Sequence, residues 1–546
     1  MTPASWMRAA GTLVIASAVA VAYSVSAEEG TTPLPSANCA TLQGFSIDAS
    51  AIGLPTGGAV VQSAALVAAS EKGNQNGDFC KVTGIVKPKN PSSPNMEFEV
   101  NLPLTWNRRA LQMGGGGYDG NLVTGLTPYT AQPANVDNPL KQGFVTLGSD
   151  GGHKSSGPGF DGRWATDDEA LANFGKMSVK KAHDAAMAII KKAYGRAPER
   201  FYFIGGSQGG HEALDAAARY SADYDGVVAH YPAYNVTLLH LGSLNVGKAI
   251  YADKGAAWVS PAKTKLITDA VYAKCDDLDG VKDGIISNVK ACNSAFDVKT
   301  LRCAAGATAS DTCLTDAQIA AVVKITSDYK PGVTVAGMDM FPRWPLLEGA
   351  LFQVSTFGKA PQPSNPANGS EALLYGPGDQ TVKFIITRDP KIDPLTFDPR
   401  QWKERVAAAA SMMDVTDVSL ATFKAKGGKI IMTHGTADDF ITPHNSELYY
   451  QRQVKAFGQP GVDSFMRFYM IPGFGHGFGP FNTKFESLKL LQDWVEKGQA
   501  PKNPTATDGN PNANRSRPLC EWPKWPKFTG APGSENSAAS FTCTAS

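Results

Sequence analysis

The chain has 546 residues, of which 42% are hydrophobic and 18% charged, and its 51 basic and 50 acidic residues leave a net charge of +1. This length is sufficient for a large core and for more than one domain. The composition, with 55 glycines and 36 prolines, fits a loop-rich globular protein and excludes a disordered or fibrous one. The balanced charge provides no general attraction to a phosphate backbone, so nucleic acid is not expected as a partner.

The N-terminus carries the longest apolar stretch of the chain. Arg8 is followed by the uncharged residues 9–27, which end in Val25-Ser26-Ala27, small residues of the kind that a signal peptidase recognises. We interpret residues 1–27 as a cleaved signal peptide. The alternative is a transmembrane anchor, but the run is diluted by Ala, Ser, Gly and Thr. The mature protein is therefore expected to be secreted or periplasmic, with no membrane segment after cleavage.

The cysteines form an even set, which in an oxidising compartment allows four disulfides. They are Cys39, Cys80, Cys275, Cys292, Cys303, Cys313, Cys520 and Cys543. Because no Cys-x-x-Cys pair occurs and the spacings match no zinc ribbon, a thiolate metal site is not expected.

The central part of the chain alternates between strand and helix patterns. Short apolar runs at 143–148, 200–205 and 225–229 predict buried strands, and apolar residues at helical spacing predict helices over 178–193 and 211–220. No repeat with a period of about 20–50 residues is present. The alternation predicts an α/β fold with a doubly wound sheet.

A candidate nucleophile lies in the turn between the second of these strands and the helix that follows it. The sequence there is Gly205-Gly206-Ser207-Gln208-Gly209. Gly-x-Ser-x-Gly between a strand and a helix is a nucleophile elbow, in which small neighbours allow a sharp turn that exposes the Ser hydroxyl. In a glycine-rich chain the bare motif could also be an ordinary loop, but its context favours the elbow. We therefore predict Ser207 as a nucleophile.

A serine nucleophile needs a histidine to take its proton and a carboxylate to orient that histidine, and α/β-hydrolases place them in the order Ser, acid, His. The strand expected at 427–433 leads into a loop with Asp438 and Asp439. Both carboxylates lie in one turn, and we prefer Asp438. His476 follows the strand expected at 466–471, in a glycine-rich loop that suits a base reaching across the site.

Two other late histidines are less suitable as the base. His434 precedes the acid, and His444 follows a Thr-Pro pair that is typical of a helix start. The alternative for His476 itself is a surface histidine without a role. The oxyanion hole is expected to combine the N–H of Gln208 with one from the Gly114–Gly117 loop, at Gly116 or Gly117. No Gly-Lys-Ser/Thr follows that loop, which excludes a P-loop.

Residues 234–415 break the strand-helix alternation and predict an inserted lid domain, while residues 28–233 and 416–546 form the catalytic domain. An insertion at this place can cover the site and determine substrate choice. Within it, residues 275–286 hold four carboxylates in a span of eight residues. Such carboxylates repel one another unless a hard cation lies between them, so we predict bound Ca²⁺. The loop lacks the terminal Glu of an EF-hand, and the alternative is a solvated acidic turn.

The chain resembles the tannase and feruloyl esterase family of α/β-hydrolases, which includes mono(2-hydroxyethyl) terephthalate hydrolase. The resemblance extends over nearly the whole mature chain and rests on an ordered set of motifs, at residues 102–107, 114–117, 205–209, 275–286, 435–438, 472–476, 517–523 and 539–543. It implies hydrolysis of small-molecule esters of aromatic acids, such as gallic or hydroxycinnamic acid, through an acyl-enzyme. The alternatives are an esterase acting on polyester-derived or aliphatic esters, and a catalytically idle exported binding protein.

The resemblance also assigns residues to roles. It implies the triad Ser207, Asp438 and His476, and a calcium ion held by the Asp276, Asp279 and Asp283 carboxylates and by the carbonyls of Val281 and Ile285. With it, chain neighbours suggest the disulfides 39–80, 275–292, 303–313 and 520–543.

One departure from the family concerns the catalytic loops. Most members carry a Cys immediately before the nucleophile and another immediately after the base, joined by a disulfide. Here these positions are Gly206 and Gly477. Because its loop lacks this covalent tether, His476 is expected to be less firmly held than in those relatives.

Overall fold

The computed structural model describes residues 1–2, 30–155, 160–305, 310–352, 356–364, 369–416 and 419–545. The predicted signal peptide, residues 1–27, lies almost entirely outside the described residues. Within the described ranges, no helix is both long enough and apolar enough to cross a membrane.

A ten-stranded sheet forms the centre of the molecule, with the strand order β12-β11-β10-β9-β7-β8-β5-β4-β3-β2. Its strands are β2 Ser46–Ile47, β3 Ala59–Val67, β4 Phe79–Val86, β5 Met96–Pro103, β7 Arg109–Met113, β8 Val145–Ser149, β9 Arg200–Gly206, β10 Gly226–His230, β11 Lys429–Gly435 and β12 Met466–Ile471. Neighbours from β12 to β8 are parallel, whereas β5, β4, β3 and β2 pair antiparallel. The predicted α/β-hydrolase fold is confirmed, and the antiparallel extension adds to it.

Side chains of the parallel strands alternate between two separate cores, one on each face of the sheet. In β9, Phe201 and Phe203 belong to one core, and Tyr202 and Ile204 to the other. This alternation follows from the period of two residues in a strand. Helices α3 Ser178–Tyr194, α4 Gln208–Ala218 and α12 Pro443–Phe457 contribute to the first core and α14 Ser487–Lys497 to the second. Both faces are therefore covered, as in a doubly wound sheet.

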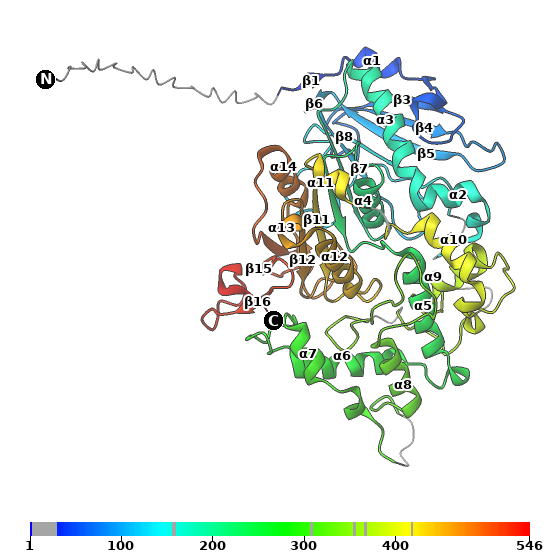
Figure 1. Cartoon of the computed structure of the whole chain (residues 1–546), viewed down its shortest axis with the longest axis vertical. Helices are drawn as coiled ribbons and strands as arrows, with labels where there is room; N and C mark the ends of the chain where they lie inside the picture. Colours follow the sequence, from blue (N-terminus) through cyan, green and yellow to red (C-terminus); the bar gives the residue numbers. More distant parts are fainter. Residues whose placement is uncertain are drawn as a thin grey trace.

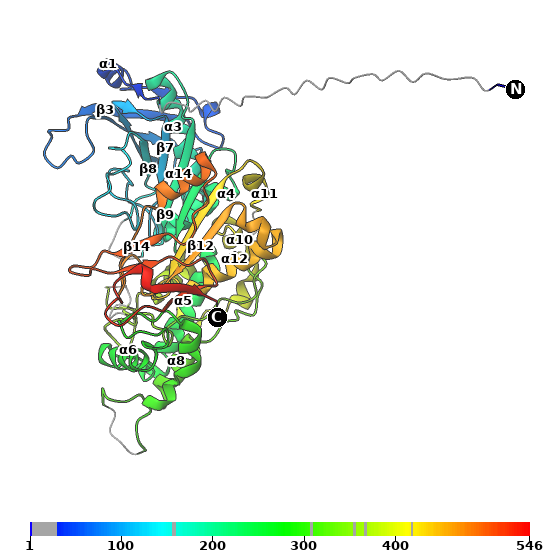
Figure 2. The same ribbon diagram turned by 90° about the vertical axis from the view of Figure 1, so that its left-hand side faces the viewer.

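Six α-helices of the described chain lie within residues 234–415, in the segment between β10 and β11. They are α5 Val236–Ile250, α6 Pro261–Cys275, α7 Val289–Ala295, α8 Asp316–Ile325, α9 Tyr375–Gln380 and α10 Lys403–Met413. Figures 1 and 2 both place α6 and α8 at the end of the molecule opposite β3 and β4. This segment matches the predicted lid at residues 234–415, although its division from the catalytic part as a domain stays a prediction.

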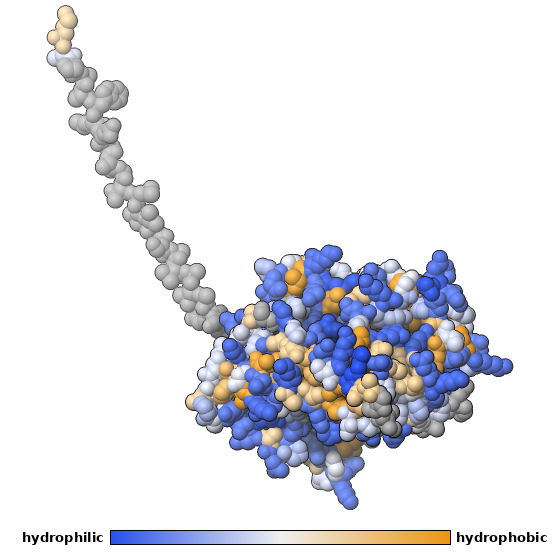
Figure 3. All heavy atoms as spheres, turned by 90° about the horizontal axis from the view of Figure 1, so that it is seen from below, coloured by the Kyte–Doolittle hydropathy of each residue, from blue (hydrophilic) through white to orange (hydrophobic). Residues whose placement is uncertain are grey.

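The remaining α-helices and strands of the described residues are short. They are α1 Ser36–Ala40, α2 Asp168–Ala172, α11 Ala421–Ala425, α13 Gln459–Asp463, β1 Thr32–Pro33, β6 Thr105–Trp106, β13 Thr483–Lys484, β14 Thr505–Asp508, β15 Ser516–Pro518, β16 Trp525–Phe528 and β17 Phe541–Thr544. Figure 3 shows the molecule from the end where α6 and α8 lie. This face is mostly hydrophilic, with hydrophobic residues in small groups.

The structure contains the four expected disulfides, Cys39–Cys80, Cys275–Cys292, Cys303–Cys313 and Cys520–Cys543. No free cysteine remains. This state is the one expected of an exported protein in an oxidising compartment.

Candidate active site

Ser207 occupies the turn between β9 and α4 with φ 60° and ψ −120°. A non-glycine residue in this region is strained, so its surroundings must hold it there. A Cβ at Gly205 would lie 2.4 Å from the carbonyl oxygen of Gly209, and a Cβ at Gly209 would lie 2.8 Å from that of Gly115. Glycines two residues before and after Ser207 are therefore required for so tight a turn, as expected of a nucleophile elbow.

Asp438 and His476 come together at the carboxyl ends of β11 and β12. His476 Nδ1 lies 2.9 Å from Asp438 Oδ2, and the N–H groups of Phe440 and Ile441 each donate to Asp438 Oδ1 at 2.9 Å. Burial by itself raises the pKa of Asp438, but the charge and hydrogen bonds of the neighbouring histidines hold it well below its usual range. Asp439 instead accepts a hydrogen bond from Thr356 in the lid segment.

The same pair affects His476. Burial lowers the pKa of the imidazole, but the charge of Asp438 and its hydrogen bond outweigh that effect, and the net pKa is raised. The contact at Nδ1 leaves Nε2 available for proton transfer. Among the described residues no hydrogen bond joins Ser207 Oγ to His476, which is common before substrate binds.

A second histidine supports the acid. His434 Nε2 lies 2.9 Å from the carbonyl oxygen of Ile441 and 3.3 Å from Asp438 Oδ2, while its Nδ1 lies 2.7 Å from Ser446 Oγ. The sequence argument set His434 aside as a base and missed this contact with the acid loop, because the contact depends on how the loop after β11 folds back.

The glycine loop after β7 supplies one side of the candidate oxyanion hole. Gly117 and Gln208 line the same cavity as Ser207, whereas Gly116 lines a neighbouring cavity. The N–H groups of Gly117 and Gln208 donate to no protein group among the described residues. Of the two glycines considered, Gly117 is thus the one placed beside the nucleophile.

Two buried carboxyl groups contact the Gly114–Gly117 loop at Gly115. The sequence did not predict either contact. Glu212 Oε2 accepts from the N–H of Gly115 at 2.8 Å, and a Cβ at Gly115 would lie 2.1 Å from Asp119 Oδ1. Burial, together with the negative charge of nearby acids, raises the pKa of Glu212 to about 7 and that of Asp119 well above its usual range. The sequence offered no signal, since neither residue belongs to the Ser, acid and His pattern.

The cavity at Ser207 encloses about 390 Å³ when the space open to solvent at its mouth is included. Phe160, Phe174 and Phe440 form much of its wall, and α5 contributes two polar residues, His240 and Ser243. A small cavity with aromatic walls and few polar groups is typical of a site for a small apolar ligand with a defined orientation.

Comparison with known proteins identifies the family of the chain. The family model described as tannase and feruloyl esterase matches residues 80–544. The chain belongs to the tannase and feruloyl esterase family. It is 37% identical over 519 residues to an uncharacterized esterase of Agrobacterium fabrum, with 92% of each chain covered.

Two further relatives extend the comparison. The chain is 28% identical over 526 residues to the mono(2-hydroxyethyl) terephthalate hydrolase of Piscinibacter sakaiensis, covering 86% of this chain and 85% of that protein. The crystal structure of feruloyl esterase B from Aspergillus oryzae superposes with a TM-score of 0.74 at 22% identity, over 93% of this chain and 100% of that chain. Like these relatives, the protein is a carboxylic ester hydrolase.

In this tannase and feruloyl esterase family member, the aromatic side chain of Tyr231 lies between Gly206 and Gly477, the two positions that the sequence comparison with the family singled out. A Cβ at Gly206 would lie 2.9–3.0 Å from the ring and hydroxyl of Tyr231, and a Cβ at Gly477 would lie 3.5 Å from the same hydroxyl. The Tyr231 ring also packs on His476, with centroids 4.6 Å apart. Tyr231 therefore bridges the two glycine positions by packing instead of by a covalent bond.

The acidic loop between α6 and α7 holds the predicted calcium ligands. The carboxylates of this loop accept hydrogen bonds from its own backbone. Asp276 accepts from the N–H of Gly284 at 2.9 Å, and Asp283 accepts from the N–H of Ile285 at 3.0 Å. Asp279 accepts two, from the N–H groups of Val281 and Ser287 at 3.3 and 3.1 Å. Burial raises the pKa of Asp276, and it raises that of Asp279 to about 6, in both cases with a contribution from the charge of Asp283. Arg517 pairs with Asp283.

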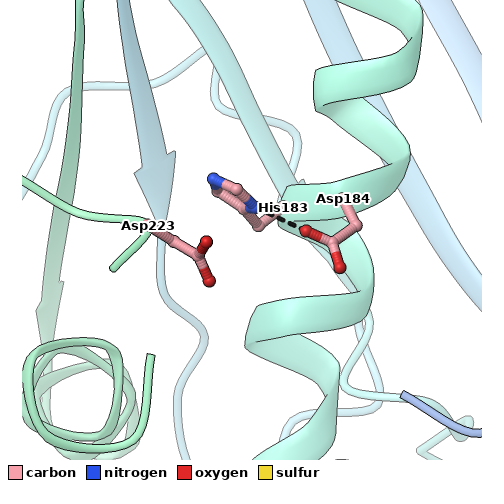
Figure 4. Close-up of side chains that lie close together, drawn as sticks. All are labelled: His183, Asp184 and Asp223. Atoms are coloured by element: carbon pink, nitrogen blue, oxygen red, sulfur yellow. Dashed lines mark hydrogen bonds and ion pairs between the residues drawn. The ribbon is translucent and has the colours of Figure 1, made fainter. Parts of the chain in front are cut away.

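Only one group of acidic and histidine side chains in the described part of the chain brings three ligand atoms within 4.8 Å of one another: His183, Asp184 and Asp223 (Figure 4). It is not the acidic loop. Lys180 Nζ lies 2.7 Å from Asp184 and 3.0 Å from Asp223. This ammonium group already balances both carboxylates, so the cluster is better described as an ion-pair network than as a metal site.

His444 lies in the first turn of α12, as predicted. Its two nitrogens contact Glu348 and Glu447 at 2.7 and 2.9 Å. Burial alone would lower the pKa of His444, but the two glutamates raise it to about 9. The Thr442 hydroxyl does not cap this helix. It donates instead to the carbonyl oxygen of Arg343 in the lid segment, at 2.6 Å.

Proposed function

We propose that this esterase hydrolyses carboxylic esters of aromatic acids, of the gallic or hydroxycinnamic type, through an acyl-enzyme. The observation that carries the proposal is the strained Ser207 elbow opening onto a cavity walled by Phe160, Phe174 and Phe440. Aromatic rings pack well against aromatic walls. A planar aromatic acyl group suits so small a cavity better than a long flexible chain does.

In the proposed reaction, Ser207 Oγ attacks the ester carbonyl while His476 Nε2 takes its proton. Asp438 holds His476 Nδ1 and stabilises the imidazolium that forms. The N–H groups of Gly117 and Gln208 receive the negative charge that develops on the carbonyl oxygen. His476 then returns the proton to the leaving alcohol, and water repeats the sequence on the acyl-enzyme.

Relatives support this range of substrates without deciding among them. One is named a mono(2-hydroxyethyl) terephthalate hydrolase, and another, from Aspergillus niger and 28% identical over 487 residues, a feruloyl esterase B. Both names refer to esters of aromatic acids. Two other classes of substrate compete with this proposal: aliphatic esters, and the esters that are released from polyesters.

A substrate panel tests the proposal. Rates are compared for methyl gallate, methyl ferulate, mono(2-hydroxyethyl) terephthalate and p-nitrophenyl butyrate. We expect kcat/KM to be highest for a hydroxylated aromatic ester. Hydrolysis of the butyrate alone would contradict an aromatic acyl specificity, and hydrolysis of none would favour a catalytically idle binding protein.

We also propose that the acidic loop binds Ca²⁺. Asp276, Asp279 and Asp283, with the carbonyls of Val281 and Ile285, form a hard oxygen donor set of the kind that Ca²⁺ prefers. The support is the burial of Asp276 and Asp279, which are 7% and 1% exposed, in the same short loop as Asp283. A bound cation would compensate the negative charge of these carboxylates. Ile285 also packs on Gly473 near the His476 loop, so the ion would stabilise the base side of the site.

We propose that the protein is exported to the periplasm or beyond the cell after cleavage behind Ala27. The four disulfides support an oxidising destination. Mass spectrometry of the mature protein tests this proposal. A protein that begins at Glu28 is expected, whereas a protein that keeps residues 1–27 in a membrane fraction would point to an anchor.

A further inference from the structure

The wall of the Ser207 cavity changes from apolar to polar along α5. This helix begins close to the nucleophile, because Ala233 donates its N–H to the carbonyl oxygen of Ser207 at 3.2 Å. Four residues on one face of the helix line the cavity, namely Val236, Leu239, His240 and Ser243. With a rise of about 1.5 Å per residue, Ser243 lies about 10 Å along the helix from Val236. The polar residues are thus on the part of the wall farther along the helix.

A chain of buried hydrogen bonds determines which nitrogen of His240 carries the proton. Tyr118 Oη lies 2.9 Å from the carbonyl oxygen of Pro377 and 2.9 Å from Thr381 Oγ1, and Thr381 Oγ1 lies 2.7 Å from His240 Nδ1. Tyr118 Oη also lies 3.5 Å from His240 Nδ1, a long contact that can share a proton with a shorter one. The three short contacts need three protons. The Tyr118 and Thr381 hydroxyls supply two and the carbonyl supplies none, so the third proton must belong to His240 Nδ1.

The other nitrogen of His240 is consequently a free acceptor. Burial lowers the pKa of His240 to about 3, so the ring is neutral near pH 7 and carries its one proton on Nδ1. His240 is 7% exposed, and its Nε2 is neither hydrogen-bonded to a described residue nor among the fully buried unpartnered atoms. The lone pair of Nε2 therefore opens onto the cavity that His240 lines.

Ser243 complements this acceptor one helical turn further along. Its hydroxyl lines the same cavity and has no hydrogen-bond partner among the described residues. A hydroxyl can donate as well as accept, whereas Nε2 of the neutral imidazole here can only accept. A ligand group that donates to one and accepts from the other would satisfy both.

We infer that His240 and Ser243 form a subsite for a phenolic hydroxyl of the acyl group, which donates to His240 Nε2 and accepts from Ser243 Oγ. This inference rests on the proposed function, in which an aromatic acyl group enters the Ser207 cavity. A phenol provides one donor and one acceptor on the same atom. A carboxylate is only an acceptor and would face the lone pair of Nε2, so the subsite selects against terephthalate monoesters.

The selectivity of the wild-type enzyme is the first test. We compare kcat/KM for methyl benzoate, methyl 3-hydroxybenzoate, methyl 4-hydroxybenzoate and methyl 4-methoxybenzoate. Two neutral hydrogen bonds predict a preference of about 10- to 100-fold for the better hydroxybenzoate over methyl benzoate. The methoxy ester cannot donate to Nε2, so it should lose most of this preference.

Variants then assign the preference to the two residues. Ser243→Ala and His240→Phe should each reduce the ratio between hydroxylated and unsubstituted esters by about 5-fold or more, and His240→Gln, which keeps an acceptor, should restore part of it. Asn245→Ala is the matched control, since Asn245 is on α5 but does not line the cavity, and it should keep the wild-type ratio. Thermal melting shows that each variant is folded.

The outcomes distinguish this inference from the proposed function. Hydrolysis of the methyl benzoates with no preference for a hydroxyl, or with a preference that survives in both Ser243→Ala and His240→Phe, would overturn the subsite while leaving an esterase for aromatic acids. Hydrolysis of p-nitrophenyl butyrate but of no ester of an aromatic acid would overturn the aromatic specificity, and the subsite with it.

Discussion

The loops that carry Ser207 and His476 meet at one site but are held in different ways. Ser207 follows a strand hydrogen-bonded on both sides, and its own N–H and carbonyl bond to His230 and Ala233 at 3.0 and 3.2 Å. The loop of His476 contains glycines in left-handed backbone conformations, and two of its residues, Gly477 and Phe478, are exposed.

His476, the proposed base, is therefore positioned by side chains more than by the backbone. Its ring lies between Tyr231 and Phe440, with centroid distances of 4.6 and 5.2 Å, and Asp438 holds one nitrogen. The comparison shows two ways of holding a loop at this site. Ser207, the proposed nucleophile, is held by the backbone of its turn, whereas His476, the proposed base, is held by the side chains that pack on its ring.

The largest expected effect comes from removing the nucleophile. Ser207→Ala should lower turnover by about 10⁶-fold and abolish labelling by an organophosphonate. The melting temperature should change little, because the hydroxyl faces the cavity and contributes little packing. Mass spectrometry of the labelled protein checks the result, and labelling that persists in the variant would identify another nucleophile.

Removing the base should have an effect of similar size. His476→Ala should lower kcat by about 10⁶-fold, whereas His444→Ala should retain turnover, since His444 is paired with two glutamates away from Ser207. A reversed pattern would assign the base to His444.

The pH dependence sharpens this assignment. His476 must be neutral to take a proton, and Asp438 raises its pKa, so kcat/KM should increase as the pH rises through a value above the ordinary pKa of about 6.5. Asp438→Asn removes the charge that raises this pKa. In this variant the pH at which the remaining kcat/KM rises should then shift to a lower value. A rise at the same pH as in the wild type would contradict the pairing of Asp438 with His476.

Variants of Tyr231 test whether the packing of its ring positions His476. Tyr231→Ala removes the ring that lies against His476 and should lower kcat by about 10- to 100-fold, because small misplacements of catalytic groups cost rate. Tyr231→Phe keeps the ring and should cost less than Tyr231→Ala. Equal losses in both variants would show that the hydroxyl matters and that the ring does not.

Calcium should stabilise the base side of the site. Chelation is expected to lower the melting temperature, because an ion bound only to the folded state contributes about 2.7 kcal/mol at a concentration of 100 Kd. Asp279→Asn should show a smaller response to chelator, and Asp269→Asn, an exposed change on α6 outside the loop, is the control. Protein prepared without chelators that contains no calcium would overturn the calcium proposal.

The smallest effect is expected from restoring the cysteine pair. The double change Gly206→Cys and Gly477→Cys should form a disulfide poorly beside Tyr231, since a Cβ at Gly206 would lie 2.9 Å from its ring. Adding Tyr231→Ala should make room for the bond and raise the melting temperature relative to Tyr231→Ala alone. Thiol titration follows bond formation, and full oxidation in the presence of Tyr231 would contradict the packing argument.

The sequence by itself determined the elements whose local pattern is strong. The expected strands at 200–205, 225–229 and 466–471 correspond to β9, β10 and β12, and the helix expected at 178–193 corresponds to α3. Apolar runs and turn glycines are local signals, and the order of Ser, acid and His follows from the chain path of the fold. These signals were sufficient to predict Ser207, Asp438 and His476 as a triad, and the structure brings His476 Nδ1 to 2.9 Å from Asp438 Oδ2.

The sequence did not predict the antiparallel strands β3, β4 and β5, or the side chains that converge on the site from distant segments. Tyr231, Asp119 and His240 belong to no local motif, and their importance comes from packing between residues far apart in the chain. Periodicity cannot reveal such contacts, because it depends only on near neighbours in sequence. Only the tertiary structure decided which side chain fills the space between Gly206 and Gly477, which glycine lies beside Ser207, and which polar residues line the cavity.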